Sequence, residues 1–344
     1  MPAPSPSHST RLSPRAVGIA AAVVTVLVWT SFILIARASS DPARGGTLTP
    51  FDIAFCRIVG ASLILLPWGA WLSYRDRDRG GIHQSSLLGV SPLSWRVTAT
   101  VGFFGGLLYA LVAYNGFVYA PAAHASVLLP GSLPLWTALL AALILHDHIT
   151  PLRALGLGLI VLGDLLVGGK SLIGAFDGGE VWKGDLLFMA GAMSWAAYSV
   201  LARRHHLDAV RATIAITAFA FVTYVPVYSV LVLGGFVPGQ VFSAPLRELM
   251  FQAVFQGWGS VVVSGITFTK MIQYFGPVRS TMITALVPGL SALGAVLMLG
   301  EPLYWNLAAG LVLVTLGILF GVRAAAPMEN KTIAANALST GARG

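Results

Sequence analysis

The chain has 344 residues, of which 56% are hydrophobic and 10% are charged, and its mean hydropathy is +0.80. Ordinary soluble domains carry roughly 25% charged residues, so this composition excludes that class and indicates a polytopic membrane protein. The net charge of +8 lies mostly in loops and tails and reports topology, not nucleic-acid binding, and the single cysteine, Cys56, excludes an intrachain disulfide and a multi-cysteine metal site.

Ten apolar segments follow a Pro- and Ser-rich start, residues 1–15, which is predicted to be disordered and cytoplasmic. A helix needs about 20 apolar residues to cross the hydrocarbon core, and backbone groups in lipid must pair internally. Each segment is therefore predicted to be a transmembrane helix in an all-α protein. The segments are 16–36, 52–73, 97–118, 122–145, 152–169, 184–202, 212–234, 249–274, 278–299 and 304–322, and a tail follows at 323–344.

Landmark residues of the first half recur at constant offsets in the second half. An offset of 166 positions relates Gly18, Trp29 and Arg37 to Gly184, Trp195 and Arg203. An offset of 154 positions relates Pro134, Asp147, Gly156 and Gly163 to Pro288, Glu301, Gly310 and Gly317. Five crossings per half place the second unit (184–322) upside down relative to the first (16–169), with 170–183 as the connecting loop. Inverted repeats around a midplane cavity are typical of secondary transporters, so the pattern predicts transport.

The Lys and Arg residues predict the orientation. With the amino terminus in the cytoplasm, fourteen of them fall on the cytoplasmic side and six on the other, while Lys270 stays inside a span. Cytoplasmic loops of membrane proteins carry the excess of Lys and Arg. Both termini are therefore predicted to be cytoplasmic.

Four stretches carry a resemblance to a known family. They are the stretch from Trp29 to Arg37, the stretch from Phe51 to Arg57, Leu133-Pro134-Leu135 with the following His146-Asp147, and Val287-Pro288-Gly289 with the following Gly300-Glu301-Pro302. On these motifs, residues 16–322 resemble the EamA-type ten-helix branch of the drug/metabolite transporter superfamily, and within it the YddG-type exporters of amino acids. The resemblance implies a bacterial inner-membrane protein with a central cavity lined by helices one, three, four, six, eight and nine. Helices five and ten are then peripheral, and the embedded glutamate that small multidrug relatives carry in helix one has no counterpart in 16–36.

Aromatic residues away from the predicted membrane edges are candidates for the cavity wall. They can stack on a planar side chain or hold an ammonium group by cation–π attraction, although packing between helices is the alternative for each. The candidates are Trp29, Tyr109, Tyr114, Trp136, Trp195, Tyr198 and Trp258.

Three ionisable residues need separate interpretation. His124, near the start of the fourth helix, suits proton exchange or contact with a substrate carboxylate, or it simply bonds a neighbouring carbonyl. Lys270 either binds a substrate carboxylate near the cytoplasmic mouth or snorkels to the interface. Asp164 is on the expected peripheral fifth helix, close to its end, and we do not expect it to contact substrate.

Five further residues are candidates for gating. Pro130, Pro134 and Pro288 are predicted to kink the fourth and ninth helices. Asp147 and Glu301 end matching helices on opposite faces, where they either close a gate by pairing or cap a tight turn. Arg37 and Arg203, at equivalent helix ends, are expected to be interfacial anchors.

Other function classes find little support in the motifs. The pairs of histidines in 146–148 and 205–206 cannot close a tetrahedral metal site alone, and we expect no metal and no cofactor. The leading hypothesis is a secondary transporter that exports amino acids, aromatic or neutral, or related metabolites by uniport or proton coupling. The alternatives are a sugar-phosphate or nucleotide-sugar exchanger, a membrane-embedded enzyme, and a non-transporting receptor. The expected partners are a small-molecule substrate and the bilayer but no nucleic acid, and a monomer is compatible with the pattern.

Overall fold

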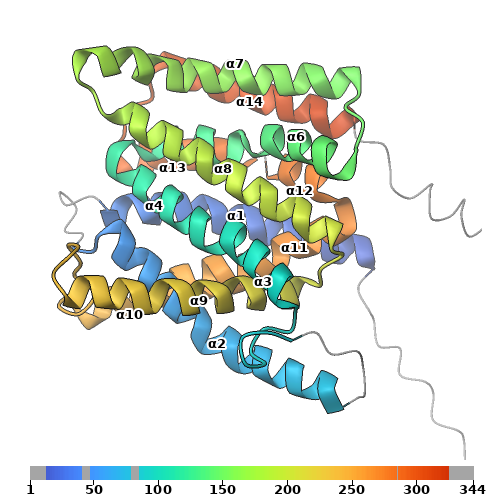
Figure 1. The fold of residues 1–344 in the computed structure, drawn as a ribbon. Helices are drawn as coiled ribbons and strands as arrows, with labels where there is room; N and C mark the ends of the chain where they lie inside the picture. The colour runs from blue at the N-terminus through green and yellow to red at the C-terminus, as the bar shows by residue number, and fades with distance from the viewer. Residues whose placement is uncertain (1–12, 41–46, 79–84, 285, 325–344) are drawn as a thin grey trace, which may run out of the picture.

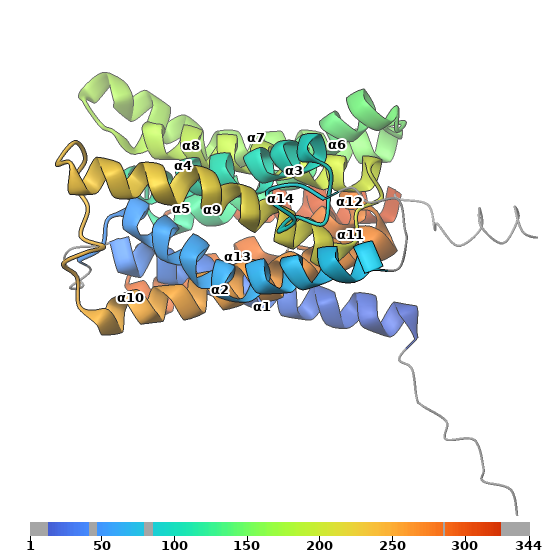
Figure 2. The ribbon, with the colours of Figure 1, turned by 60° about the horizontal axis from the view of Figure 1, so that its bottom comes forward.

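The computed structural model describes residues 13–40, 47–78, 85–284 and 286–324. Within these ranges the regular structure is helical, apart from one isolated β-bridge between Ser86 and Ser91. The helices run lengthwise in one bundle (Figures 1 and 2). The predicted terminal segments fall outside the described residues, except for 13–15 and 323–324.

Every predicted span corresponds to a helical segment. In the first half these are α1 (Pro14–Ser40), α2 (Pro50–Asp78), α3–η2–α4 (Trp95–Gly102, Phe103–Leu108, Tyr109–Tyr119), α5–η3–α6 (Ala122–Ser126, Val127–Gly131, Leu133–Leu145) and α7 (Pro151–Gly174). After η4 (Ala175–Asp177), the second half has α8 (Val181–Arg204), α9 (Ala209–Leu233), α10–η5–α11 (Leu246–Gln252, Ala253–Val263, Ser264–Phe275), α12–α13 (Pro277–Ile283, Leu286–Leu299) and α14 (Trp305–Ala324).

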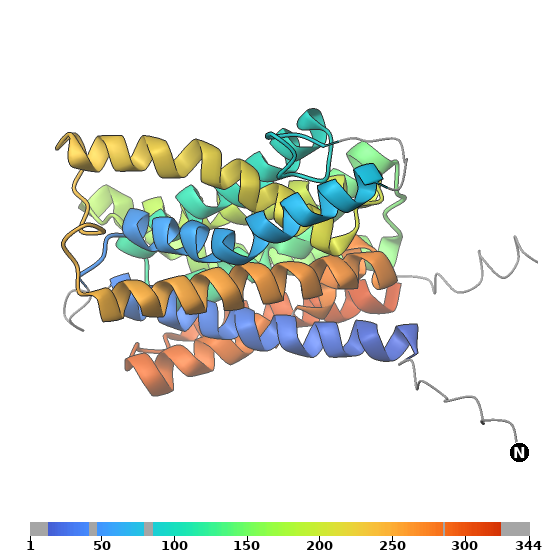
Figure 3. The same cartoon turned by 90° about the horizontal axis from the view of Figure 1, so that it is seen from below.

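The described residues contain nine helical segments that are long and apolar enough to cross a membrane, and α14 adds a shorter apolar helix at Trp305–Gly321. The prediction of an all-α polytopic membrane protein is therefore confirmed. The first residue of α1 and the last residues of α14 lie at the same end of the bundle (Figure 3), as an even number of crossings requires.

Helices α7 and α14 pack through glycines at two points. A Cβ atom at Gly156 would lie 2.5 Å from the carbonyl oxygen of Gly317, and one at Gly163 would lie 2.7 Å from that of Gly310. Rising numbers in α7 meet falling numbers in α14, so the two helices are antiparallel. Gly156 corresponds to Gly310 and Gly163 to Gly317 in the repeat, so each contact is the image of the other. This symmetry of the two glycine contacts supports an inverted relationship between the halves.

The fourth segment and its repeat counterpart, the ninth, are both interrupted. The π-helical turn η3 contains Pro130, and α6 starts at Leu133 with Pro134 in its first turn. In the counterpart, α12 ends before Thr284, and α13 starts at Leu286 with Pro288 in its first turn. A proline at a helix start leaves no intrahelical donor missing. Pro134 and Pro288 therefore begin new helices and do not bend continuous ones.

Helix α7 is longer than the span predicted for it. The segment was expected to end at residue 169, but the helix continues to Gly174. Two adjacent glycines cost only about 1 kcal/mol each in a helix, and the charged end of Lys170 can extend outward from it. Asp164 therefore lies ten residues, or about 15 Å, before the helix end, and not within a turn or two of it.

Candidate functional site

An aromatic cluster occupies the centre of the bundle. The rings of Trp29 on α1 and Trp195 on α8 meet edge to face, with centroids 5.8 Å apart. The ring of Phe268 on α11 contacts both, at 4.9 Å from Trp29 and 5.7 Å from Trp195. Tyr109 and Tyr198 add contacts to Trp195 at 4.9 Å and 5.2 Å. Edge-to-face pairs of this kind contribute beyond their buried area, so the two halves are joined here by aromatic packing.

An apolar cavity with an empty volume of about 330 Å³ borders this cluster. Trp29, Tyr109 and Trp195 form part of its wall. The rest of the wall comprises Phe32, Ile33, Leu129, Pro130, Leu133, Ala192 and Val287. Both interrupted segments thus contribute to the wall of this cavity. Pro130 lies in η3, and Val287 lies near the start of α13.

A second cavity, with an empty volume of about 480 Å³, shares Trp195 with the first and contains a charged residue. Arg57 lies seven residues into α2, and its side chain is buried, with 7% exposed. Its Nη1 donates to Ser260 Oγ at 3.0 Å and to Tyr114 Oη at 3.3 Å. Tyr114 in turn donates to Gln256 Oε1 at 2.9 Å. These bonds hold the guanidinium beside the cavity.

The charge of Arg57 has aromatic neighbours, and no acidic partner within the described ranges. The guanidinium carbon lies 5.8 Å from the ring centroid of Phe32, 5.9 Å from that of Tyr109 and 6.0 Å from that of Tyr114. No carboxylate in the described part of the chain forms a salt bridge with it. An uncompensated charge inside a membrane protein is costly and points to function. The guanidinium is therefore suited to bind an anionic group that enters the cavity.

Sequence reasoning missed Arg57 as a functional residue. Its position near the predicted start of the second helix placed it among the topology charges. The resemblance did note an arginine at this point of the family pattern. The additional signal available was its place inside the span 52–73, where an arginine is rare.

Of the other predicted cavity residues, some line one of the two central cavities and some do not. Tyr198 lines the second cavity, and its hydroxyl is 2.6 Å from Thr269 Oγ1. Trp136 packs against the cluster without lining either cavity, and its buried indole N–H has no acceptor among the described residues. Trp258 is 42% exposed and donates to the carbonyl oxygen of Gly60 at 3.0 Å. Lys270 is half-buried and lines neither space.

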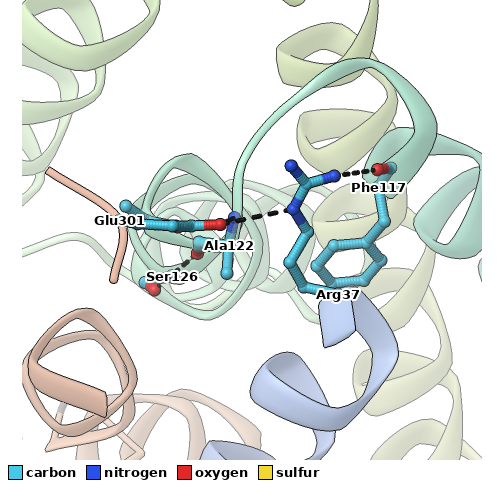
Figure 4. A network of polar contacts seen from close by, with 6 residues as sticks. Arg37, Phe117, Ala122, Ser126 and Glu301 are labelled. Atoms are coloured by element: carbon cyan, nitrogen blue, oxygen red, sulfur yellow. Dashed lines mark hydrogen bonds and ion pairs between the residues drawn. The ribbon is translucent and has the colours of Figure 1, made fainter. Parts of the chain in front are cut away.

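An ion pair joins the two halves where α1 ends (Figure 4). Arg37 Nε donates to Glu301 Oε1 at 3.2 Å, and Arg37 Nη1 donates to the carbonyl oxygen of Phe117 at 3.1 Å. The Glu301 carboxylate also accepts the backbone N–H groups of Ala122 and Ala123, at 3.2 Å and 3.1 Å. Glu301 therefore pairs with a cation and binds the first N–H groups of α5, while its role in a gate stays a prediction.

A second ion pair repeats this arrangement where α8 ends. Arg203 Nη1 donates to Asp147 Oδ2 at 3.0 Å. Arg203 is the repeat equivalent of Arg37, and Asp147 is that of Glu301. Each arginine lies eight residues, about 12 Å, beyond its central tryptophan, and the two pairs therefore lie toward opposite ends of the bundle. Both arginines hold acids of the other half and are not simply anchors in the interface.

His124 lies apart from the central cavities. Its Nδ1 is 2.9 Å from Asp185 Oδ1, so α5 is tied to the first turns of α8. A third cavity, with an empty volume of about 580 Å³, lies behind this pair between α6, α7 and α8, and Asp164 and Asp185 both line it.

Known proteins resemble the chain in sequence and in fold. The sequence profile of the EamA-like transporter family matches residues 16–169 and again residues 182–323. The uncharacterized transporter YyaM of Bacillus subtilis (strain 168) is 27% identical over 243 residues, which cover 70% of this chain and 75% of the relative. The uncharacterized transporter YdfC of the same organism is 26% identical over 304 residues, which cover 85% of this chain and 89% of that relative. A solved crystal structure with 19% identity shares the fold, with a TM-score of 0.56 over 90% of this chain and 98% of that chain.

Proposed function

Since the chain belongs to the EamA-like transporter family and is a multi-pass membrane transporter, we propose that it exports a small amphipathic carboxylate, namely a neutral or aromatic amino acid, by alternating access. The observation that carries this proposal is that Arg57 is buried at the wall of a central cavity and has no acidic partner among the residues that the structure describes. A substrate carboxylate supplies the missing negative charge and accepts charge-assisted hydrogen bonds, which are stronger than neutral ones. The aromatic wall next to it offers a surface for the apolar part of the substrate.

The charge of the cavities argues against a phosphorylated substrate. Arg57 is the one charged residue among the described residues that line the two central cavities. A sugar phosphate carries close to two negative charges and is usually held by several cations. Lys270 lines neither cavity and cannot supply the second cation in this conformation. A single guanidinium matches a single carboxylate.

The two ion pairs suggest how access alternates. In the proposed cycle, the pair Arg37–Glu301 and the pair Arg203–Asp147 open in turn, so that the cavities communicate with one side of the membrane at a time. Both pairs are formed in the structure, which fits an occluded conformation. The interrupted helices next to Pro130 and Pro288 supply points at which each half can bend without breaking intrahelical hydrogen bonds.

The orientation also belongs to the proposal. The excess of Lys and Arg on one side supports cytoplasmic termini. The similarity to YdfC of Bacillus subtilis supports a bacterial cytoplasmic membrane. In this orientation, Arg203–Asp147 faces the cytoplasm and Arg37–Glu301 faces the outside.

Liposomes that contain the purified protein test the substrate class. They are loaded in parallel with radiolabelled phenylalanine, methionine, threonine and a sugar phosphate, and efflux is measured. We expect efflux of at least one amino acid from the wild type, and loss of that efflux in Arg57→Gln with partial recovery in Arg57→Lys. Arg96→Gln, which alters an exposed arginine outside the cavities, is the matched control. Efflux of the phosphate ester with none of any amino acid would refute the proposal.

A further inference from the structure

We propose that the third cavity is a proton-binding site that couples export to the proton gradient, with Asp164 as the group that binds the proton. The proposal rests on the proposed transport function but not on Arg57 or on the central cavities. The cavity lies between α7, α8 and the interrupted helix α5–η3–α6, and its wall is apolar apart from Asp164 and Asp185.

Asp164 is a buried carboxylate without a hydrogen-bond partner in the described part of the chain. Its side chain is 7% exposed, and neither carboxylate oxygen has a hydrogen-bond partner among the described residues. It lies near the middle of α7, and Leu165 and Val161 beside it are 58% and 37% exposed on the outer surface of the bundle. A charged carboxylate in such an apolar place is very costly unless a cation or a proton accompanies it.

No cation among the described residues fills this role. The described residues of α14, α6 and η3 that pack against α7 contribute no charged side chain on this side. Lys170, on α7 itself, lies over the ring of Tyr304 at 5.0 Å, and Lys183, on α8, pairs with Glu180. The remaining ionisable neighbours are Asp185 and its partner His124. A bound proton therefore neutralises Asp164 in these surroundings.

Asp185 connects this carboxylate to the fourth helix. Gly168 lies one turn beyond Asp164 on the same face of α7, and a Cβ atom there would be 4.0 Å from Asp185 Oδ2. The other oxygen, Oδ1, is 2.9 Å from His124 Nδ1. The absence of a side chain at Gly168 thus leaves the space between the two acids open, and a proton that enters from the outer side can pass from His124 and Asp185 to Asp164 through water in the cavity.

The relay ends next to the outer ion pair. His124 directly follows Ala122 and Ala123, whose N–H groups bind Glu301. A change of charge at His124 therefore acts on the same helix start that holds Glu301 against Arg37. In the coupled cycle, one proton from the outside binds at Asp164 and is released to the cytoplasm for each substrate molecule that leaves, and no covalent bond other than an O–H or N–H bond forms or breaks.

Proteoliposomes with a pH gradient test the coupling. The lumen is made one pH unit more acidic than the bath, and the membrane potential is clamped at zero. For one proton per substrate, the wild type is expected to accumulate phenylalanine up to about tenfold, since one pH unit corresponds to a tenfold ratio. Asp164→Asn should show no accumulation, while its exchange of labelled for unlabelled phenylalanine, which needs no net proton movement, stays near the wild-type rate.

Two variants of α7 separate a site from a general packing effect. Gly168→Leu fills the space beside Asp185 and is expected to abolish the accumulation. Gly158→Leu places the same side chain on the same helix at an exposed position with nothing within 4 Å, outside the cavity, and should accumulate phenylalanine like the wild type. Full accumulation by Asp164→Asn, or none by a wild type that exchanges phenylalanine, would overturn the proton site and leave the carrier proposal intact.

An infrared measurement that needs no substrate tests the proton site if the protein transports no amino acid. If the wild type neither accumulates nor exchanges any amino acid, the proposed substrate class fails, and infrared difference spectra between acidic and alkaline pH then decide the proton site alone. We expect a carboxylic acid C=O band in the wild type that Asp164→Asn lacks. Identical spectra for the two proteins would contradict proton binding at Asp164.

Discussion

Trp29 and Trp195 occupy equivalent positions in the two halves, and their indole rings meet edge to face with centroids 5.8 Å apart. Residues related by the repeat can touch only near the axis that relates the halves. The two tryptophans therefore mark the centre of the bundle. Trp195 is the more enclosed residue, with 7% of its surface exposed and four aromatic neighbours.

Replacement of Trp195 by alanine is expected to destabilise the protein strongly. Truncation of a buried tryptophan leaves a void and typically costs about 3–5 kcal/mol. The matched control is Trp305→Ala, where 74% of the side chain is exposed and the expected change is about 0.5 kcal/mol or less. Thermal unfolding in detergent measures both. Equal shifts of the melting temperature would contradict a central packing role for Trp195.

The glycine contacts between α7 and α14 lead to a second prediction. A Cβ atom at Gly156 would lie 2.5 Å from the Gly317 carbonyl oxygen, a backbone atom that cannot move aside alone. Gly156→Ala is therefore expected to destabilise by about 1–3 kcal/mol through overpacking. Gly158→Ala, two residues on and with nothing within 4 Å, should be neutral or stabilising by about 1 kcal/mol, since alanine favours the helix. Thermal unfolding compares the pair, and a milder effect at Gly156 than at Gly158 would speak against the close crossing.

The two ion pairs predict selective opening of each end. Partly exposed ion pairs contribute about 1 kcal/mol or less, so loss of one should raise the open population about twofold to fivefold. In a Cys56→Ser background with Tyr109→Cys in the cavity wall, Glu301→Gln should increase labelling by an impermeant maleimide from the side of Glu301. Asp147→Asn should increase it from the opposite side. Increases from the same side for both variants would contradict the assignment of the pairs to opposite mouths.

Hydropathy and constant offsets were sufficient to predict the ten helical segments and to single out Trp29 and Trp195, which lie on the wall of a central cavity. The function of Arg57 was not predictable in this way. Only the packing of α2 against α4 and η5 brings Tyr114 and Ser260 to its guanidinium. Trp258 lies in η5, where a π-helical turn shifts the helical phase, so the face on which its ring lies could not be inferred from a 3.6-residue period.

Asp164 illustrates the same limit. The predicted span 152–169 places it near a helix end. The helix continues past that end to Gly174, and Lys170 within it lies over the ring of Tyr304, which directly precedes α14. The carboxylate of Asp164 therefore lies near the middle of a helix, where it is buried, and not near the helix end that the predicted span gave it.

The hydrogen bond from Arg57 to Tyr114 predicts a specific loss of substrate affinity. Tyr114→Phe removes the hydroxyl that accepts from Arg57 and donates to Gln256, while the buried ring stays in place. Hydrogen bonds to charged groups contribute about 1.5–3 kcal/mol, so a guanidinium that is no longer held should raise the KM for the amino acid about tenfold or more. The maximal rate should change little, because the ion pairs and interrupted helices are untouched. Efflux measured over a range of internal substrate concentrations separates the two parameters. The control is Lys270→Gln, which alters a cation outside both central cavities and should leave the KM within about twofold of the wild-type value. If the KM rose for Lys270→Gln but not for Tyr114→Phe, the carboxylate site would be assigned to Lys270 and not to Arg57.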